Sequence, residues 1–180
     1  MFQNRVTTKV YGGTYRAVTP GVTYGYDGKV IAGSTGLCSA GGAAVPFATG
    51  RLSMVRSGPG SSPVSSTSYA HDSLGRVVLS VQTIAGVPSL PFRYTYNALD
   101  EVTQETYPTG RTVVTDYDNA GRLFSVKNAF TSTIYGGSAG YAANGAMSSL
   151  TLETGNTETT TFNSRFQVTG FNAGLMALGY

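Results

Sequence analysis

The chain has 180 residues, of which 41% are hydrophobic and 12% charged, a composition typical of a packed protein rather than a disordered one. Its formal net charge is +3, but the 12 basic residues are spread along the chain, and the lack of a basic cluster argues against nucleic-acid binding. No stretch approaches the roughly 18 to 20 consecutive apolar residues of a membrane helix. The start, MFQNRVTTKV, lacks the apolar core of a signal peptide.

The composition also predicts the fold class. The chain contains 24 glycines and 12 tyrosines, threonine and serine are abundant, and long helix-forming stretches are absent. Tyrosine and threonine favour strands, and glycine favours tight turns. We therefore expect an all-β protein made of many short antiparallel strands.

One short motif recurs along the whole chain. Each copy starts with an aromatic residue, or with His71 in one case, and closes on an aliphatic residue or methionine. The first positions of the eight copies are Phe2, Tyr26, Phe47, His71, Tyr96, Tyr117, Tyr141 and Phe162. Their spacings are 24, 21, 24, 25, 21, 24 and 21 residues. A unit of this length cannot bury its own apolar face, so neighbouring units must stack.

The motif has a physical reading as a turn between two strands. The aromatic residue ends one strand and faces the core, and the Asp or Asn after it opens a turn through its own side chain. A glycine supplies positive φ, and a basic residue starts the returning strand with its stem on apolar surface. The positions assigned to this structural role are Tyr26, Asp27, Phe47, Arg51, Asp72, Gly75, Arg76, Tyr96, Tyr117, Asp118, Gly121, Arg122, Leu123, Tyr141 and Phe162.

A second turn divides each unit. The segments that start at Val102 and Met147 have equal length and place Gly110 and Gly155 at the same position. Leu150, Leu152 and Val114, which flank these glycines, alternate with threonine-rich partners, as expected for half-buried strands. One unit is therefore predicted to be two strands and two turns, and eight units a single antiparallel ribbon spanning residues 1–180.

The motif resembles the tyrosine-aspartate (YD) repeat of the Rhs family, which is related to the shells of insecticidal toxin complexes and to teneurins. The best copy is YDNAGRL, with Tyr117, Asp118, Gly121, Arg122 and Leu123 at the family positions. The resemblance covers essentially the whole chain. It implies a β-sheet ribbon that winds into a hollow shell around a polypeptide cargo, a structural role without catalysis, and an extracellular or cell-surface location.

The chain also departs from that family. Full shells use many more repeats, and they usually end in a plug with an autoproteolytic site rich in Asp-Pro. This sequence contains no Asp-Pro dipeptide. We therefore expect a segment of a shell, or a small protein derived from one, without a plug or a self-cleavage site.

Residues that could carry chemistry have simpler explanations. Cys38 is the only cysteine and His71 the only histidine, so a Cys, His and Asp nucleophilic set is conceivable, but no local signature supports it. His71 stands where the other copies carry tyrosine or phenylalanine, and is expected to replace a core aromatic. Each turn holds one carboxylate, too few for calcium. The glycine-rich runs match no phosphate-binding motif. We expect no enzyme activity, no metal and no cofactor.

The segment SGPGSSPVSSTS, residues 57–68, has the composition of a linker. It does not disturb the spacing from Phe47 to His71, so we predict an exposed loop within a single repeat array.

Three functions remain open. The end strands of a ribbon carry unpaired backbone groups, so they favour pairing with neighbouring repeats of a longer chain or with further copies of this chain. The chain is thus either a segment of an encapsulating toxin shell, or a secreted subunit that assembles end to end into a filament or tube. A third possibility is a monomeric module that binds carbohydrate or protein through its aromatic and threonine surface.

Overall fold

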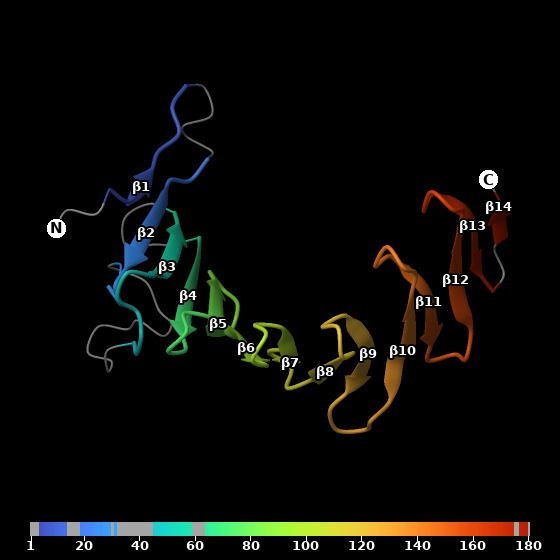
Figure 1. Ribbon diagram of the computed structural model, residues 1–180. Coiled ribbons are helices and arrows are strands. Elements are labelled where there is room, and N and C mark those ends of the chain that lie inside the picture. Colours follow the sequence, from blue (N-terminus) through green and yellow to red (C-terminus); the bar gives the residue numbers. More distant parts are fainter. Residues whose placement is uncertain are drawn as a thin grey trace. The chain divides into compact units, whose positions relative to one another are not determined.

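The computed structural model describes residues 4–13, 19–29, 31, 45–58, 64–174 and 177–179. These residues form strands and turns, and none of them lies in a helix. The strands are antiparallel and follow one another in a sheet in their order along the chain, from β1 to β14 (Figure 1). The prediction of an all-β fold built from antiparallel hairpins is confirmed.

The strands in the described part of the chain are short. They are β1 (Thr8–Lys9), β2 (Val22–Tyr26), β3 (Leu52–Ser57), β4 (Ser65–His71), β5 (Val77–Ile84), β6 (Leu90–Tyr96), β7 (Val102–Thr106), β8 (Thr112–Tyr117), β9 (Leu123–Asn128), β10 (Ile134–Tyr141), β11 (Met147–Leu152), β12 (Thr157–Phe162), β13 (Val168–Ala173) and β14 (Ala177–Gly179).

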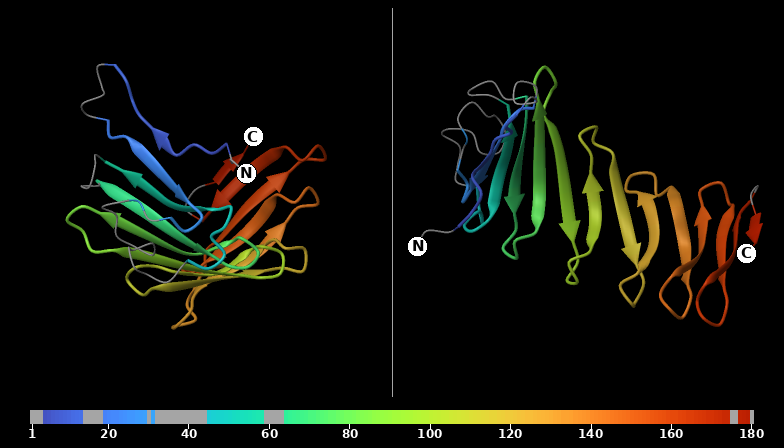
Figure 2. Two further views of the ribbon diagram at one scale, coloured as in Figure 1. Left: turned by 90° about the vertical axis from the view of Figure 1, so that its left-hand side faces the viewer. Right: turned by 90° about the horizontal axis from the view of Figure 1, so that it is seen from above.

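The chain divides into two compact units. The first comprises Met1–Tyr94 with Tyr107–Thr109, and the second comprises Thr95–Thr106 with Gly110–Tyr180. Each unit is a single layer of strands (Figure 2). Within the described residues no second layer covers the strands, so most of their side chains are only half-buried. The buried hydrophobic residues among them are Ala48 and Met54.

A β-bulge follows the turn of the repeat motif. Tyr117 lies directly opposite Leu123, whereas the preceding residue, Asp116, lies opposite Ser125, so β9 has one extra residue there. A bulge of this kind bends the strand and strengthens its twist. The same shift occurs beside the pairs Tyr26 and Leu52, His71 and Val77, Tyr141 and Met147, and Phe162 and Val168.

Threonines join neighbouring strands on the exposed side of the second unit. The hydroxyl groups of Thr151 and Thr157 lie 3.0 Å apart across β11 and β12. Along β12 the exposed Thr157, Thr159 and Thr161 alternate with half-buried residues. This alternation is the half-buried strand pattern that the sequence predicts.

The segment predicted as an exposed loop, residues 57–68, is largely strand at its two ends. β3 runs to Ser57 and β4 begins at Ser65, and the side chains of Ser66 and Ser68 are buried. Ser68 lies opposite Met54 in the sheet, where its small side chain fits beside the buried methionine. Serine content misled the prediction because backbone pairing, not composition, orders these residues; residues 59–63 lie outside the described part.

Candidate functional site

In the repeat turns, the Asp side chain that follows the aromatic residue bonds to the main chain of the turn and to the arginine four residues later. The Asp118 carboxylate accepts hydrogen bonds from the main-chain NH groups of Ala120 and Arg122, at 2.8 and 2.9 Å. Its other oxygen pairs with the Arg122 guanidinium at 2.7 Å. Asp72 makes the same set of contacts with Leu74 and Arg76. The acid and the arginine of the motif are therefore one clamp.

Two other turns reach the same geometry with reversed polarity. Asn97 and Asn163 accept main-chain NH groups as the aspartates do, but their amide nitrogens donate to Glu101 at 2.5 Å and to Gln167 at 2.9 Å. Where the first position of the turn carries a carboxylate, the fifth carries a guanidinium. Where the first carries an amide donor, the fifth carries a carboxylate or amide oxygen that accepts from it. The two positions change together, which is a rule that the sequence analysis missed.

The turn after Tyr141 has no clamp but keeps the backbone geometry. Ala142 and Ala146 occupy the two positions, and the main-chain NH of Ala142 still donates to the Ala146 carbonyl at 2.9 Å. Gly145 has a φ of 81° there. The Asn144 side chain accepts the main-chain NH of Ala146 at 3.1 Å, so this turn keeps one side-chain acceptor although it lacks the clamp between its first and fifth residues.

Tyrosines of the motif tie one unit to the unit before it. The hydroxyl of Tyr117 donates to the Val102 carbonyl at 2.9 Å, and that of Tyr141 donates to the Leu123 carbonyl at 2.6 Å. Tyr26 donates to the Val6 carbonyl at 3.1 Å in the same way. Each acceptor is the aliphatic residue that closes the preceding turn. The sequence predicts that these rings face a core, but it does not predict the bond of the hydroxyl to the preceding unit.

Arginine adds a second link between successive units. The guanidinium of Arg122 lies 4.3 Å from the centre of the Tyr141 ring, and that of Arg5 lies 4.7 Å from the centre of the Tyr26 ring. A cation over an aromatic face contributes about 0.5 to 1 kcal/mol at an exposed site. Arg122 therefore serves its own turn and the next unit at once.

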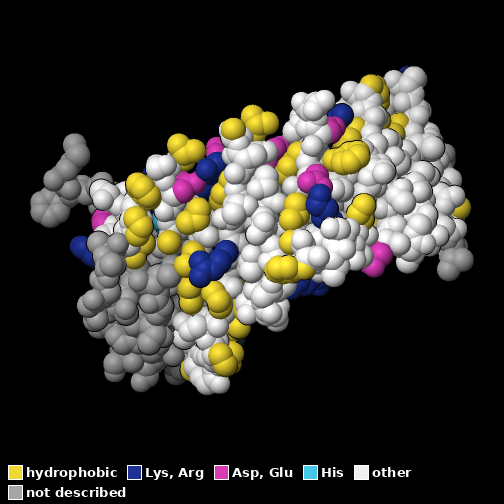
Figure 3. All heavy atoms as spheres, turned by 90° about the horizontal axis from the view of Figure 1, so that it is seen from below, with side chains coloured by type: hydrophobic (Ala, Val, Ile, Leu, Met, Phe, Trp, Pro, Cys, Tyr) yellow, Lys and Arg dark blue, Asp and Glu magenta, His cyan; other side chains and the backbone are white. Residues whose placement is uncertain are grey.

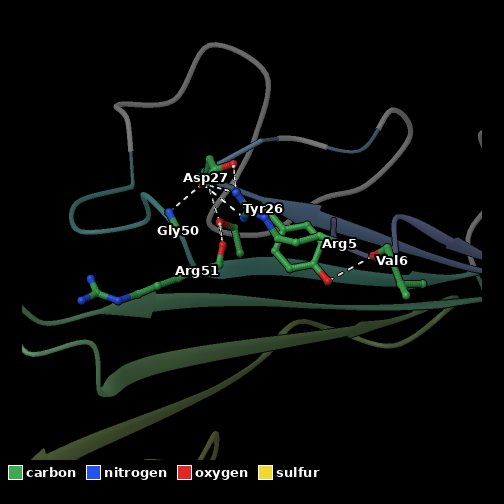
Figure 4. Close-up of polar contacts among 8 residues, drawn as sticks. Arg5, Val6, Tyr26, Asp27, Gly50 and Arg51 are labelled. Carbon is green, nitrogen blue, oxygen red and sulfur yellow. Dashed lines mark hydrogen bonds and ion pairs between the residues drawn. The ribbon is translucent and has the colours of Figure 1, made fainter. Parts of the chain in front are cut away.

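The copies of the motif at Tyr26 and Phe47 form one turn together (Figure 4). Tyr26 lies opposite Leu52 in the sheet, the main-chain NH of Asp27 donates to the Arg51 carbonyl at 3.0 Å, and the Asp27 carboxylate accepts the NH of Gly50 at 2.6 Å. Residues 27–51 thus connect two adjacent strands. Asp27 also pairs with Arg5 of the preceding copy at 3.1 Å.

The structure therefore differs from the prediction of a separate unit that starts at Phe47. Phe47 lies in a turn with a φ of 55°, does not end a strand, and is 53% exposed. Its carbonyl accepts a hydrogen bond from the Arg51 guanidinium. The copies at Tyr26 and Phe47 look separate in sequence because they begin 21 residues apart, like other successive copies.

These contacts hold the carboxylates in their charged form. Hydrogen bonds from the Arg122 side chain and main chain lower the pKa of Asp118. The NH of Gly50, followed by the Arg5 side chain, lowers the pKa of Asp27. On β8, hydrogen bonds from Lys127 and Ser125 lower the pKa of Asp116. Carboxylates that are satisfied in this way are structural acceptors rather than proton donors.

His71 ends β4 at the aromatic position of the motif. Its side chain is buried, and Nδ1 has no hydrogen-bond partner among the described residues. Burial, and then the nearby Arg51 charge, lower the pKa of the ring. The imidazole therefore occupies an aromatic place in the sheet without supplying the tie that tyrosine supplies elsewhere.

Glycines of the motif leave room for the preceding unit. A Cβ built on Gly75 lies 2.8 Å from Nε of Arg51, and one built on Gly121 lies 2.8 Å from Oε1 of Glu101. Both glycines also have positive φ, 94° and 72°. At these two positions glycine meets the conformational need, and an added Cβ would also displace the end of a side chain from the preceding unit.

The remaining predicted positions lie at the ends of strands. Tyr96 and Phe162 end β6 and β12, and Leu123 begins β9. Cys38 lies outside the described residues. Within the described ranges, no group of three or more His, Cys, Asp or Glu residues is arranged to hold a metal ion. The helix-free described part also offers no candidate helix for crossing a membrane.

Several of the charged side chains on the surface lie in pairs of opposite charge. On the face drawn in Figure 3, basic and acidic side chains lie next to one another in several small groups, and hydrophobic side chains are scattered between them. The clamps and the Lys127–Asp116 pair, at 2.7 Å, are pairs of this kind.

No family model matches the sequence, and no curated protein matches it. Solved structures of toxin complexes share the fold. The TcdB2-TccC3-Cdc42 structure aligns with 69% of this chain at 17% identity and a TM-score of 0.57. The Tc holotoxin pore of Photorhabdus luminescens, with a mutation in TccC3, aligns with 86% at 16% identity and a TM-score of 0.60.

A third structure, TcdB2-TccC3 without its hypervariable C-terminal region, aligns with 91% of the chain at 12% identity and a TM-score of 0.55. This chain spans only 6%, 7% and 10% of the lengths of the three proteins. At these identities the likeness shows the fold, which is a fold present in Tc toxin complex proteins.

Proposed function

We propose that this chain is a non-enzymatic structural protein of the Rhs type, a wall segment that continues its sheet through its two outer strands. The observation that carries the proposal is the tie between successive units, in which a tyrosine hydroxyl binds the carbonyl that closes the preceding turn. Such a tie is useful only in an array, because it needs a neighbour. The toxin-complex proteins that share the fold support the same role.

The outer strands provide the surface for continuation. Among the described strands, β1 pairs with β2 and β14 pairs with β13, so each has one backbone edge without a strand partner. An open edge of this kind templates a further strand. The partner is either the next repeat of a longer chain or another copy of this chain, and addition of copies head to tail gives a filament or tube.

The proposal includes the absence of catalysis and a location outside the cell or on its surface. The carboxylates of the motif are used in turns, where Asp72 and Asp118 accept several hydrogen bonds each. A general acid or base needs a carboxyl group that exchanges its proton with substrate. The location rests on the resemblance of the repeat to the Rhs family. A polypeptide cargo belongs to the proposal only where the chain is part of a full shell.

Electron microscopy of the purified chain at a series of concentrations tests the proposal that copies add end to end. We expect filaments or tubes that lengthen with concentration. Two lysines on the outer strand, Ala177→Lys with Leu178→Lys, should abolish growth because edge charges oppose strand pairing. The control is Val87→Lys, a change at an exposed turn residue away from both edges. Compact particles of one copy at every concentration would refute self-association.

A further inference from the structure

The half-buried face of β11, β12 and β13 contains a small hollow. Its volume is about 150 Å³, and it is lined by Met147, Ser148, Ser149, Leu150, Glu158, Thr160 and Phe171. Small-molecule sites are usually about 300 to 1,000 Å³. The hollow is therefore of a size to hold one side chain of a partner rather than a free small ligand.

A carboxylate stands inside this apolar surface. Glu158 lies on β12 directly opposite Leu150 on β11 and Ala173 on β13. In the next row, Thr160 lies opposite Phe171. Directly opposed residues project from the same face of a sheet, so Glu158 is flanked by apolar side chains on both neighbouring strands.

No cation within the described strands neutralises this carboxylate. Glu158 is the one charged residue in β11, β12, β13 and β14, and its side chain makes no ion pair or hydrogen bond with the described residues. Asp116 on β8 shows the usual arrangement, since Lys127 and Ser125 both lie 2.7 Å from its carboxylate. A half-buried, unpaired charge beside apolar groups favours an incoming opposite charge.

We propose that this hollow is a docking site for an extended polypeptide that presents a lysine or arginine between apolar residues. The aliphatic stem of the cation lies against Leu150 and Phe171, while its head group pairs with Glu158. The exposed side chains of Val168 and Leu178 on β13 and β14, 46% and 47% exposed, extend the apolar surface for the flanking residues. Binding here uses a face of the sheet, so it does not depend on continuation through the outer strands.

Fluorescence anisotropy with short labelled peptides tests the proposal. The probes are Thr-Val-Thr-Xaa-Thr-Val-Thr peptides in which Xaa is lysine, norleucine or glutamate. We expect the lysine peptide to bind the full chain about tenfold more tightly than the norleucine peptide, because only lysine forms the ion pair. The glutamate peptide should bind least, and added salt should reduce the preference for lysine.

The Glu158→Gln variant should bind the lysine and norleucine peptides equally, with the norleucine affinity unchanged. Glu153→Gln is the matched control, because Glu153 is an exposed carboxylate at the end of β11, outside the hollow. A preference for lysine that survives in Glu158→Gln would overturn the proposal, as would equal binding of all three peptides to the unmodified chain. The proposal would also be overturned if the chain bound no peptide but self-associated, and Glu158→Gln abolished that self-association. That result would assign the hollow to a second copy of the chain.

Discussion

The Tyr141 hydroxyl lies 2.6 Å from the main-chain carbonyl of Leu123, the residue that closes the preceding turn. Arg122, which directly precedes Leu123, has its guanidinium 4.3 Å from the centre of the Tyr141 ring and pairs with Asp118. Asp118, Arg122 and Tyr141 therefore form a continuous chain of contacts from one turn to the next unit. This chain explains why the repeat keeps its aromatic, acidic and basic residues at fixed places.

Removal of the tyrosine hydroxyl should weaken the sheet. Tyr141→Phe keeps the ring beneath Arg122 but leaves the Leu123 carbonyl without its donor, which should lower the free energy of unfolding by about 1 kcal/mol. Urea denaturation followed by circular dichroism measures the change. Tyr94→Phe is the control, since the Tyr94 hydroxyl makes no hydrogen bond with the described residues, and its stability should not change. Equal effects in the two variants would contradict the tie.

Replacing one residue of a clamp by the opposite charge should destabilise the fold, and changing both residues together should restore part of the stability. Arg122→Glu places a second carboxylate beside Asp118, so the urea midpoint should fall. Adding Asp118→Asn recreates the pairing of Asn97 with Glu101 and should recover about half of the loss, because the contact of Arg122 with Tyr141 is not restored. A double variant no more stable than Arg122→Glu would show that the two positions do not act as a pair.

Two glycines separate conformation from space. Gly121 and Gly145 both have positive φ. A Cβ added at Gly121 lies 2.8 Å from the Glu101 carboxylate, whereas a Cβ added at Gly145 has no described atom within 4 Å apart from its chain neighbours. In each alanine variant the free energy of unfolding should fall by about 1 to 2 kcal/mol, because alanine is strained at positive φ. Gly121→Ala should lose about 1 kcal/mol more, because Glu101 must leave its hydrogen bond to Asn97. Thermal unfolding of the two variants side by side checks the difference.

His71 should make the fold sensitive to mild acid. Burial and Arg51 lower the pKa of the folded ring below its usual 6.5, so the unfolded chain takes up a proton first. The free energy of unfolding therefore has its full value above the unfolded pKa of about 6.5 and falls as the pH drops below it. Charges that act on the ring are Arg51, which opposes protonation, and Asp72, which favours it.

Urea midpoints measured at each pH check this expectation. The variant His71→Phe places the phenylalanine of other copies at this position and should give a flat profile over the same range. The midpoint should fall only below about pH 4, where carboxylates of the unfolded chain take up protons while those of the clamps, whose pKa values are lowered, still hold their charge. If the unmodified chain gave an equally flat profile between pH 7 and pH 5, protonation of His71 would not destabilise the fold.

The sequence alone determined the fold class and the position of nearly every turn. A period of 21 to 25 residues, an aromatic residue before each turn, and a glycine or asparagine within it are local features, and local backbone preferences follow from local residues. Asp72 and Asp118 were recognised as turn residues for the same reason. Their bonds reach only as far as the residue four positions later.

Contacts between units needed the tertiary structure. The tie from Tyr117 to Val102 and the stacking of Arg122 on Tyr141 depend on which strands become neighbours and how bulges aim the side chains. The joining of Asp27 to Gly50 and Arg51 shows this most clearly, since two copies that look independent in sequence close one turn. Sequence spacing records distances along the chain, whereas strand pairing alone brings residues 23 positions apart within hydrogen-bond reach.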